Sequence, residues 1–298
     1  MSKRLCVILF TCCLFTPATV LANPLANSAS APQSEPKQAS APAELLSFLR
    51  ALDGAANKKD GAAVLAAHAP GFSHGDGLTR EQMREALQAL WQRYPDLRHT
   101  TELVKWERRG DRLVAQTRTR MVGKAAESND NFALNATLLS EQEYQVRDRQ
   151  LQITKQEILA EQNTLTTGEK PPQVRLRMPE RIGVGRQYVL DAVVTEPLGN
   201  SMLLGTQLEE AVNPREYLRD TTANLTPLRA GGIFKIGQAP FRVGSRWVSV
   251  VLVRETGITI TSQRLRVERD FVGNQYTPLL EPDSTPGRVR PPRDNRSS

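Results

Sequence analysis

Cysteine is nearly absent from this chain, and the positions of the few cysteines are informative. Three occur among the 298 residues, and all three, Cys6, Cys12 and Cys13, lie within the first 22 positions. If that segment is removed from the mature protein, the rest has no disulfide bond, no thiolate nucleophile and no cysteine metal site. The fold must then be stabilised by its core alone, which the length permits for two ordinary domains.

The first 22 residues have the features of a signal peptide. Lys3 and Arg4 begin the segment, residues 5–15 form an apolar run, and Val20-Leu21-Ala22 has the small-x-small pattern that signal peptidase cuts. A transmembrane anchor is the alternative, but the apolar run is short and is interrupted by polar residues and a proline. We therefore expect cleavage after residue 22 and export to a periplasm, a lumen or the extracellular space.

Part of the net positive charge lies in the C-terminal tail, and the rest is spread along the chain with acidic residues between. The formal net charge is +7, but there is no arginine-lysine run and no mixing of basic and aromatic residues, so we expect no nucleic-acid partner. Residues 23–43 have few apolar groups and predict a flexible linker, because they bury too little surface to offset their ordering entropy. Residues 271–298, rich in proline and arginine, predict a disordered tail that can contact an anionic surface.

The first block, residues 44–168, begins with helical signals. Leu45, Phe48, Leu49 and Leu52 recur at helical spacing. Residues 62–68 predict a second short helix that ends at Pro70-Gly71, where His68 would cap carbonyls at the helix end. A third helix is expected to begin after Thr79, since Thr79 and Gln82 form a capping-box pattern, and to stop at Pro95.

From residue 101 the hydrophobic period changes to two, which predicts four antiparallel strands joined by tight turns. The expected strands are 101–107, 113–121, 132–146 and 150–160. Three helices followed by such a meander predict an α+β fold, with the helices packed on one face of a curved sheet.

This order of elements resembles the nuclear transport factor 2-like superfamily, in its SnoaL-like branch. Residues 55–65 (AANKKDGAAVL) resemble the family's helix–Asp–helix step, Ala69-Pro70-Gly71-Phe72 resembles its short connector, and residues 144–148 resemble its last hairpin. The resemblance covers less than half of the chain. It implies a cone of helices and sheet whose mouth holds substrate in the enzymes and is plugged in the binding modules. It also implies that an enzyme of this kind would use an acid or a histidine inside the cone.

Strand alternation predicts which side chains face the cone. Neutral polar residues share a face with the apolar residues of the two middle strands. They are Thr117, Thr119, Ser140, Gln142 and Tyr144. The charged Arg118, Arg120, Glu141 and Glu143 fall on the other face. We therefore expect a site for a neutral polar ligand without an obvious general base, unless a bulge shifts the alternation.

His74 and Asp76 are the catalytic candidates. They lie in Ser73-His74-Gly75-Asp76-Gly77, before the third helix, where a histidine beside an aspartate could act as an oriented base. The alternative is a turn, since Gly-Asp-Gly is typical of one. His99 stands alone before a strand. The three scattered histidines predict no metal site, and no phosphate loop, dinucleotide loop or nucleophile elbow predicts a cofactor.

The second block, residues 171–270, has almost no helical periodicity. Short apolar runs between glycine and proline turn signals predict about seven strands, typical of a small β-sandwich. They are 174–178, 188–196, 203–212, 225–228, 233–236, 247–254 and 258–268. Residues 247–253 are apolar on both faces and predict a central strand. A helical crossover over 209–210 and 214–220 is the alternative topology. Residues 231–237 (GGIFKIG) predict a bulged turn leading into a strand, or a loop that meets a partner.

Three hypotheses follow for the function. The first is an exported, non-catalytic binding or scaffold protein, whose cone takes a small ligand or partner and whose β domain contacts protein. The second is a dehydratase- or isomerase-like enzyme in which His74 and Asp76 supply the base and Tyr144 donates to a developing oxyanion. The third is a structural role as a homodimer formed through the exposed sheet face.

Overall fold

The computed structural model describes residues 40–275, apart from 127–130, 148, 198, 200, 216, 218–220, 229–230 and 273. The predicted signal peptide lies outside the described residues, as do most of the predicted linker and tail. Within the described part, no helix combines the length and the apolar character needed to cross a membrane.

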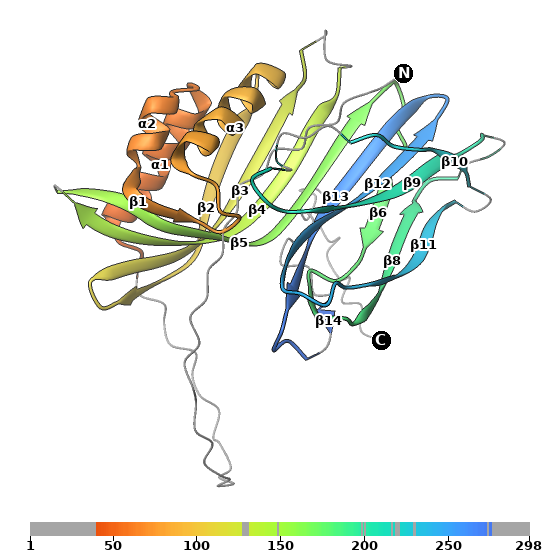
Figure 1. Cartoon of the computed structure of the whole chain (residues 1–298). Helices are drawn as coiled ribbons and strands as arrows, with labels where there is room; N and C mark the ends of the chain where they lie inside the picture. The colour runs from red at the N-terminus through yellow and green to blue at the C-terminus, as the bar shows by residue number, and fades with distance from the viewer. Residues whose placement is uncertain are drawn as a thin grey trace, which may run out of the picture.

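Three helices cover one face of a curved antiparallel sheet (Figure 1). They are α1 (Ala43–Asn57), α2 (Gly61–Ala66) and α3 (Arg80–Arg93). The predicted capping box is confirmed, since the Thr79 hydroxyl accepts from the Gln82 amide and the Gln82 side chain accepts from the Thr79 amide. Because each helix turns an apolar stripe toward the sheet, the core of this block lies between the two layers.

The segment after α2 differs from the prediction. His68 begins a strand, β1 (His68–His74), which pairs in parallel with β5, so Pro70-Gly71 lies inside a strand and does not end a helix. The register shifts between His68 and Ser73, and the proline falls in this irregular stretch, where no ladder hydrogen bond from its nitrogen is needed. The predicted capping role of His68 is confirmed, because its Nδ1 lies 2.8 Å from the Val64 carbonyl oxygen at the end of α2.

The predicted meander is present, and three of its four strands are longer than expected. It consists of β2 (Arg98–Arg109), β3 (Arg112–Lys124), β4 (Ala133–Arg147) and β5 (Gln150–Thr167). His99 therefore lies inside a strand, and β5 continues past its predicted end at residue 160. The extension has a partner, because residues 162–167 of β5 pair with residues 258–263 of β13.

The sheet continues across the expected boundary between the two blocks. Its order is β10-β9-β12-β13-β5-β4-β3-β2, with β1, β7 and β14 attached beside this path. The added strands are β7 (Arg181–Gly183), β9 (Leu204–Ala211), β10 (Thr226–Pro227), β12 (Gly244–Arg254), β13 (Gly257–Glu268) and β14 (Asn274–Gln275). At the boundary, Gly168 has φ +99° and its backbone passes close to Gly257. A Cβ on residue 168 would lie 2.5 Å from the Cα of Gly257. Only glycine fits there.

A second, three-stranded sheet belongs to the C-terminal block. It has the order β11-β8-β6, formed by β6 (Val174–Arg177), β8 (Gln187–Val194) and β11 (Gly232–Gln238). Leu190 of β8 shares one buried cluster with Val250 of β12 and Leu265 of β13. On the opposite face of β12, Trp247 and Val251 join the cluster that contains α3 residues. The strand predicted to be central is therefore buried on both faces, between β9 and β13.

The alternative helical crossover is wrong for residues 209–210, and of residues 214–220 the structure describes only 214, 215 and 217, none of which is helical. Glu209 and Glu210 lie in β9, which pairs along its length with β12. The described residues between 212 and 225 contain no helix. The two glutamates belong to a strand because its other residues complete the ladder on β12, which overrides the local helical preference of glutamate.

Candidate functional site

A buried group of charged and aromatic side chains joins the two blocks on the helix-covered face of the sheet. It consists of Asp76, Glu161, Tyr217, Trp247 and Arg264, and we call it the junction cluster. Arg264, on β13, is 0% exposed. Its guanidinium donates to Glu161 Oε2 from Nε at 3.0 Å and from Nη2 at 2.8 Å, and to the two Asp76 oxygens at 3.3 Å each.

Each carboxylate is placed by an identifiable local structure. Asp76 follows β1 in a turn closed by the Gly77 amide, which donates to the His74 carbonyl at 2.9 Å, with Gly77 at φ +77°. Glu161 lies on β5, where the register against β4 shifts between Leu139 and Ser140 and leaves Leu159 as an extra residue. This bulge turns Glu161 to the helix-covered face. Residues far apart in the sequence are thereby brought to one arginine.

Two aromatic residues complete the shell of the cluster. Trp247 pairs with Arg264 across the β12–β13 ladder, and its Nε1 donates to Glu161 Oε1 at 2.7 Å. The Tyr217 hydroxyl donates to Asp76 Oδ2, and its ring packs edge-on against the Trp247 ring with centroids 5.0 Å apart. Both carboxylates therefore accept hydrogen bonds from an aromatic side chain as well as from the arginine.

The electrostatics follow from burial and pairing. Burial raises the pKa of the Glu161 carboxyl, and the charge of Arg264 opposes this shift. Burial alone would lower the pKa of Arg264, but the negative charges of Asp76 and Glu161 outweigh it and the pKa is raised. Burial also raises the pKa of Tyr217. The arginine therefore stays charged, and two carboxylates share it.

His74, the other catalytic candidate, lies beside the cluster and is 3% exposed. Burial, followed by the nearby charge of Arg264, lowers the pKa of His74 to about 2. Its ring packs against Phe72 with centroids 5.8 Å apart. An imidazole with this pKa stays neutral at neutral pH and is a weak proton acceptor, which makes it a poor general base.

The predicted ligand-lining residues form a second buried network, which we call the hydroxyl–amide ladder. Thr117 Oγ1 lies 3.0 Å from Ser140 Oγ and 3.4 Å from Gln142 Oε1, and the Tyr144 hydroxyl donates to the same Gln142 oxygen. All four side chains are buried on one face, as the alternation predicts. The side chains therefore bond to one another.

Thr119, the fifth predicted residue, belongs to a different contact. Its hydroxyl lies 3.1 Å from the Thr101 hydroxyl, which in turn donates to Asp53 on α1 at 2.7 Å. Thr119 therefore helps to fasten the first helix to the sheet.

One buried side chain near the junction cluster is not satisfied. Asn163, on β5, is 1% exposed, and neither amide atom has a hydrogen-bond partner among the described residues. It lies between Ala136 of β4 and Ser262 of β13, and Ser262 itself bonds Ser249 at 2.6 Å. A buried amide without a hydrogen-bond partner is unfavourable, which makes Asn163 an exception among the buried polar side chains of this strand.

Sequence reasoning found Asp76 but missed its partners Glu161, Tyr217, Trp247 and Arg264. A signal was present, because Arg264 follows Ile258, Ile260 and Ser262 at alternate positions of the same strand. The partners of Arg264 could not be identified from the sequence, since Glu161 lies on β5, Trp247 on β12 and Tyr217 in the segment between β9 and β10. Among the described residues, no group of three or more histidine, cysteine, aspartate or glutamate side chains is arranged to hold a metal ion.

Comparison with known families gives one match. A family described as a domain of unknown function (DUF8623) matches residues 169–268, which is most of the C-terminal block and less than half of the chain. No curated protein matches this chain.

Some solved structures are similar to part of the chain. Bd1075 from Bdellovibrio bacteriovorus is 13% identical with a TM-score of 0.32, and the match covers 38% of each chain. A Nostoc punctiforme protein of unknown function with a cystatin-like fold is 12% identical with a TM-score of 0.29, covering 39% of this chain and 86% of its own. A chain whose name contains NTF2 is 14% identical with a TM-score of 0.29, and the match covers 38% of this chain and 95% of that one.

Proposed function

We propose that this protein is an exported, non-catalytic scaffold or binding protein. In this proposal its N-terminal block is a nuclear transport factor 2-like domain and its C-terminal block is a β-sandwich-like module for protein contact. The order of three helices and a four-stranded meander supports the first assignment. The shared buried cluster of the three-stranded sheet with β12 and β13 supports the second.

The observation that carries the proposal is the pairing of Arg264. Asp76, the carboxylate that an enzyme would use to orient a base, holds this arginine together with Glu161. Breaking such a pair would leave an uncompensated buried charge, so these groups are poorly suited to exchange protons with a substrate. The neighbouring His74, with its pKa lowered to about 2, adds to this argument.

A small polar ligand is the second part of the proposal, and Asn163 supports it. Both amide atoms of this buried residue lack a partner among the described residues. The predicted ligand-lining residues support it less, because Thr117, Ser140, Gln142 and Tyr144 already bond to one another. If the protein binds a ligand on the helix-covered face, we expect contact with Asn163.

Native mass spectrometry of the mature protein from its own host tests the binding proposal. Extra mass that is lost in an Asn163→Leu variant would identify a ligand held at this amide. Ser249→Ala is the matched control, since it changes the same row of side chains and leaves Asn163 in place. Bare protein of a defined oligomeric mass would favour the scaffold, and a dimeric mass would favour the homodimer.

An activity measurement tests the non-catalytic claim. The alternative is a dehydratase- or isomerase-like reaction that uses His74 and Asp76. Turnover that is lost in a His74→Ala variant of unchanged fold would overturn the proposal. We expect that the variant loses stability and that no turnover depends on this residue.

A further inference from the structure

The outer face of the three-stranded sheet exposes apolar side chains. Phe234 and Ile236 of β11 are 70% and 62% exposed, and Val193 of β8 is 42% exposed. The same strands bury their alternate residues, such as Leu190 and Ala192, against β12 and β13. The exposed side chains are therefore not needed to form the core, and apolar groups gathered on one face indicate an interaction surface.

Strand register places these residues side by side. Phe234 lies opposite Asp191 and Ile236 lies opposite Val189 in the antiparallel β11–β8 ladder. On the other side of β8, Val193 pairs with Arg175 and Asp191 pairs with Arg177 of β6. Because residues two apart share a face, these side chains all belong to the outer surface.

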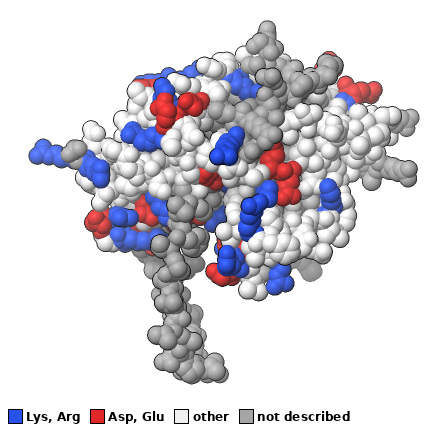
Figure 2. Space-filling view, in the orientation of Figure 1, with Lys and Arg blue, Asp and Glu red and all other residues white. Residues whose placement is uncertain are grey.

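The charged side chains among the paired positions of this face are two arginines and one aspartate. Arg175 and Arg177 are exposed along β6, and Lys235 is exposed at the edge formed by β11. Asp191 is the acidic residue among the paired positions. Figure 2 shows separate charged side chains among largely uncharged surface over the C-terminal block. We call the set Arg175, Arg177, Val193, Phe234 and Ile236 the outer β8–β11 face.

We propose that the outer β8–β11 face binds the surface of a bilayer that contains anionic phospholipids. Such a surface offers negative phosphate groups beside an apolar interior, which complements arginines next to a phenylalanine and two aliphatic side chains. Arginine can lay its aliphatic stem along apolar surface and keep its guanidinium at the phosphate level. The exposed Lys235 makes edge-to-edge pairing of β11 with another strand less favourable, which argues for contact through the face. This inference is independent of the junction cluster.

Vesicle co-sedimentation of the full mature chain tests the proposal. We expect binding to phosphatidylglycerol–phosphatidylcholine vesicles and much weaker binding to pure phosphatidylcholine. Phe234→Ser with Ile236→Ser should reduce the partition coefficient about tenfold, because apolar contact is lost. Arg175→Gln with Arg177→Gln should reduce it about tenfold or more and should weaken its dependence on salt.

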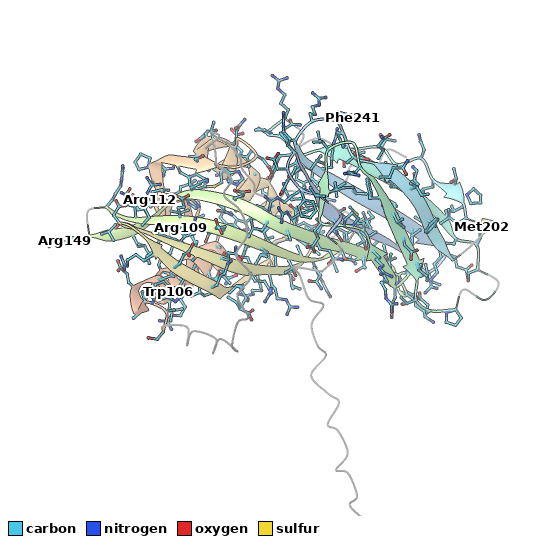
Figure 3. The ribbon with its side chains drawn as sticks, turned by 90° about the horizontal axis from the view of Figure 1, so that it is seen from below. Trp106, Arg109, Arg112, Arg149, Met202 and Phe241 are labelled. Carbon is cyan, nitrogen blue, oxygen red and sulfur yellow. The ribbon has the colours of Figure 1, made fainter. Side chains whose placement is uncertain are left out.

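Matched controls lie elsewhere on the molecule. Figure 3 shows Arg109 and Arg112 at the end of the sheet away from Met202 and Phe241. Arg109→Gln with Arg112→Gln removes two positive charges from that end. Met202→Ser removes an apolar side chain that is 69% exposed. Both controls should bind vesicles as the unchanged protein does. Thermal unfolding of every variant checks that the fold is intact.

Three results would overturn the proposal. The first is absence of binding to the anionic vesicles. The second is equal binding by the face variants and the unchanged protein, which would assign any binding to the basic tail or to another surface. The third is a dimer in analytical ultracentrifugation that the Phe234→Ser, Ile236→Ser variant converts to a monomer without any vesicle binding, which would make a second copy the occupant.

Discussion

The ion pairs on the two faces of the sheet formed by β2 to β5 differ in their exposure to water. On the open face, Arg112 pairs with Glu143 at 2.9 Å, Lys155 approaches the same carboxylate at 3.5 Å, and the side chains stay partly in water. On the helix-covered face, Glu161 and Asp76 share Arg264 without solvent. Losing one partner of the exposed ion pair should cost little stability, because water can take its place. The buried arrangement is specific, because every member depends on the others.

Neutral polar groups on the helix-covered face show an intermediate case. Thr117, Ser140 and Gln142 are as buried as the junction cluster, but none of them carries a charge. Losing one member of this ladder leaves an unsatisfied hydrogen-bonding group and no bare charge. The comparison therefore ranks three kinds of polar contact by the free energy of unfolding that each should control.

The largest effect is expected from Arg264→Met. This change leaves Glu161 and Asp76 together in the core without a cation, and the free energy of unfolding should fall by about 3–5 kcal/mol. Urea denaturation followed by tryptophan fluorescence measures it. Adding Glu161→Gln and Asp76→Asn to the same variant should restore much of the loss. A loss below about 1 kcal/mol for Arg264→Met would mean that the cluster does not control stability.

Acidification should produce the next largest effect. Burial lowers the pKa of His68 from 6.5 to about 4 and that of His74 to about 2. In both cases the unfolded chain takes up the proton first, so stability is complete above pH 6.5 and falls as the pH is lowered toward the folded pKa. Between pH 7 and pH 5 each histidine should remove about 2 kcal/mol from the free energy of unfolding.

The histidine contribution can be separated from that of Glu161. The raised pKa of Glu161 acts with the opposite sign, since its contribution is lost as the pH rises. Unfolding curves at pH 7 and pH 5 should therefore be compared between the unchanged protein and a His68→Asn, His74→Asn variant. The variant should lose less stability on acidification, and an identical loss in both proteins would contradict the assignment.

Thr117→Val should have a smaller effect. It keeps the shape of the side chain and removes its hydrogen bonds with Ser140 and Gln142, which should lower the free energy of unfolding by about 1–2 kcal/mol. Thr119→Val is the matched comparison, because Thr119 is half-buried and its hydroxyl lies 3.1 Å from that of Thr101. Chemical denaturation should show the smaller loss for position 119, and the reverse order would argue against the ladder.

The smallest effect is expected from Arg112→Gln on the open face. Its ion pair with Glu143 is partly exposed, so the free energy of unfolding should change by about 0–1 kcal/mol. High salt should remove the difference between this variant and the unchanged protein, whereas it should not remove that of Arg264→Met. A loss above about 2 kcal/mol at position 112 would erase the distinction between the two faces.

Much of the fold could be predicted because the relevant signals are local. The Thr79–Gln82 capping box lies within four residues, and the alternation along β4 places Ser140, Gln142 and Tyr144 on one face. The register shifts near these positions add extra residues to β5, so the alternation on β4 is kept. Each of the seven strands predicted for the second block overlaps an observed strand, because a short apolar run between turn residues is a local signal. The short strands β7 and β14 were not predicted.

The remaining features depend on distant residues. Glu161 faces the helices because of a bulge at Leu159, and nothing in the local pattern marks a bulge. Strand β1 contains Pro70-Gly71, a pair that ordinarily ends an element, and it is a strand because β5 lies beside it. Arg264 meets Asp76, which lies 188 positions earlier in the chain. Such contacts arise from the packed sheet and have no counterpart in local periodicity.

The pairing of β5 with β13 also has a consequence for synthesis of the chain. When β5 leaves the ribosome, its residues 162–167 have their β4 partners but must wait for residues 258–263 before their other edge is covered. During that interval the nascent sheet presents an open edge, which can pair with another nascent chain. Until residues 258–263 pair with it, this edge is therefore a place where incomplete chains can associate.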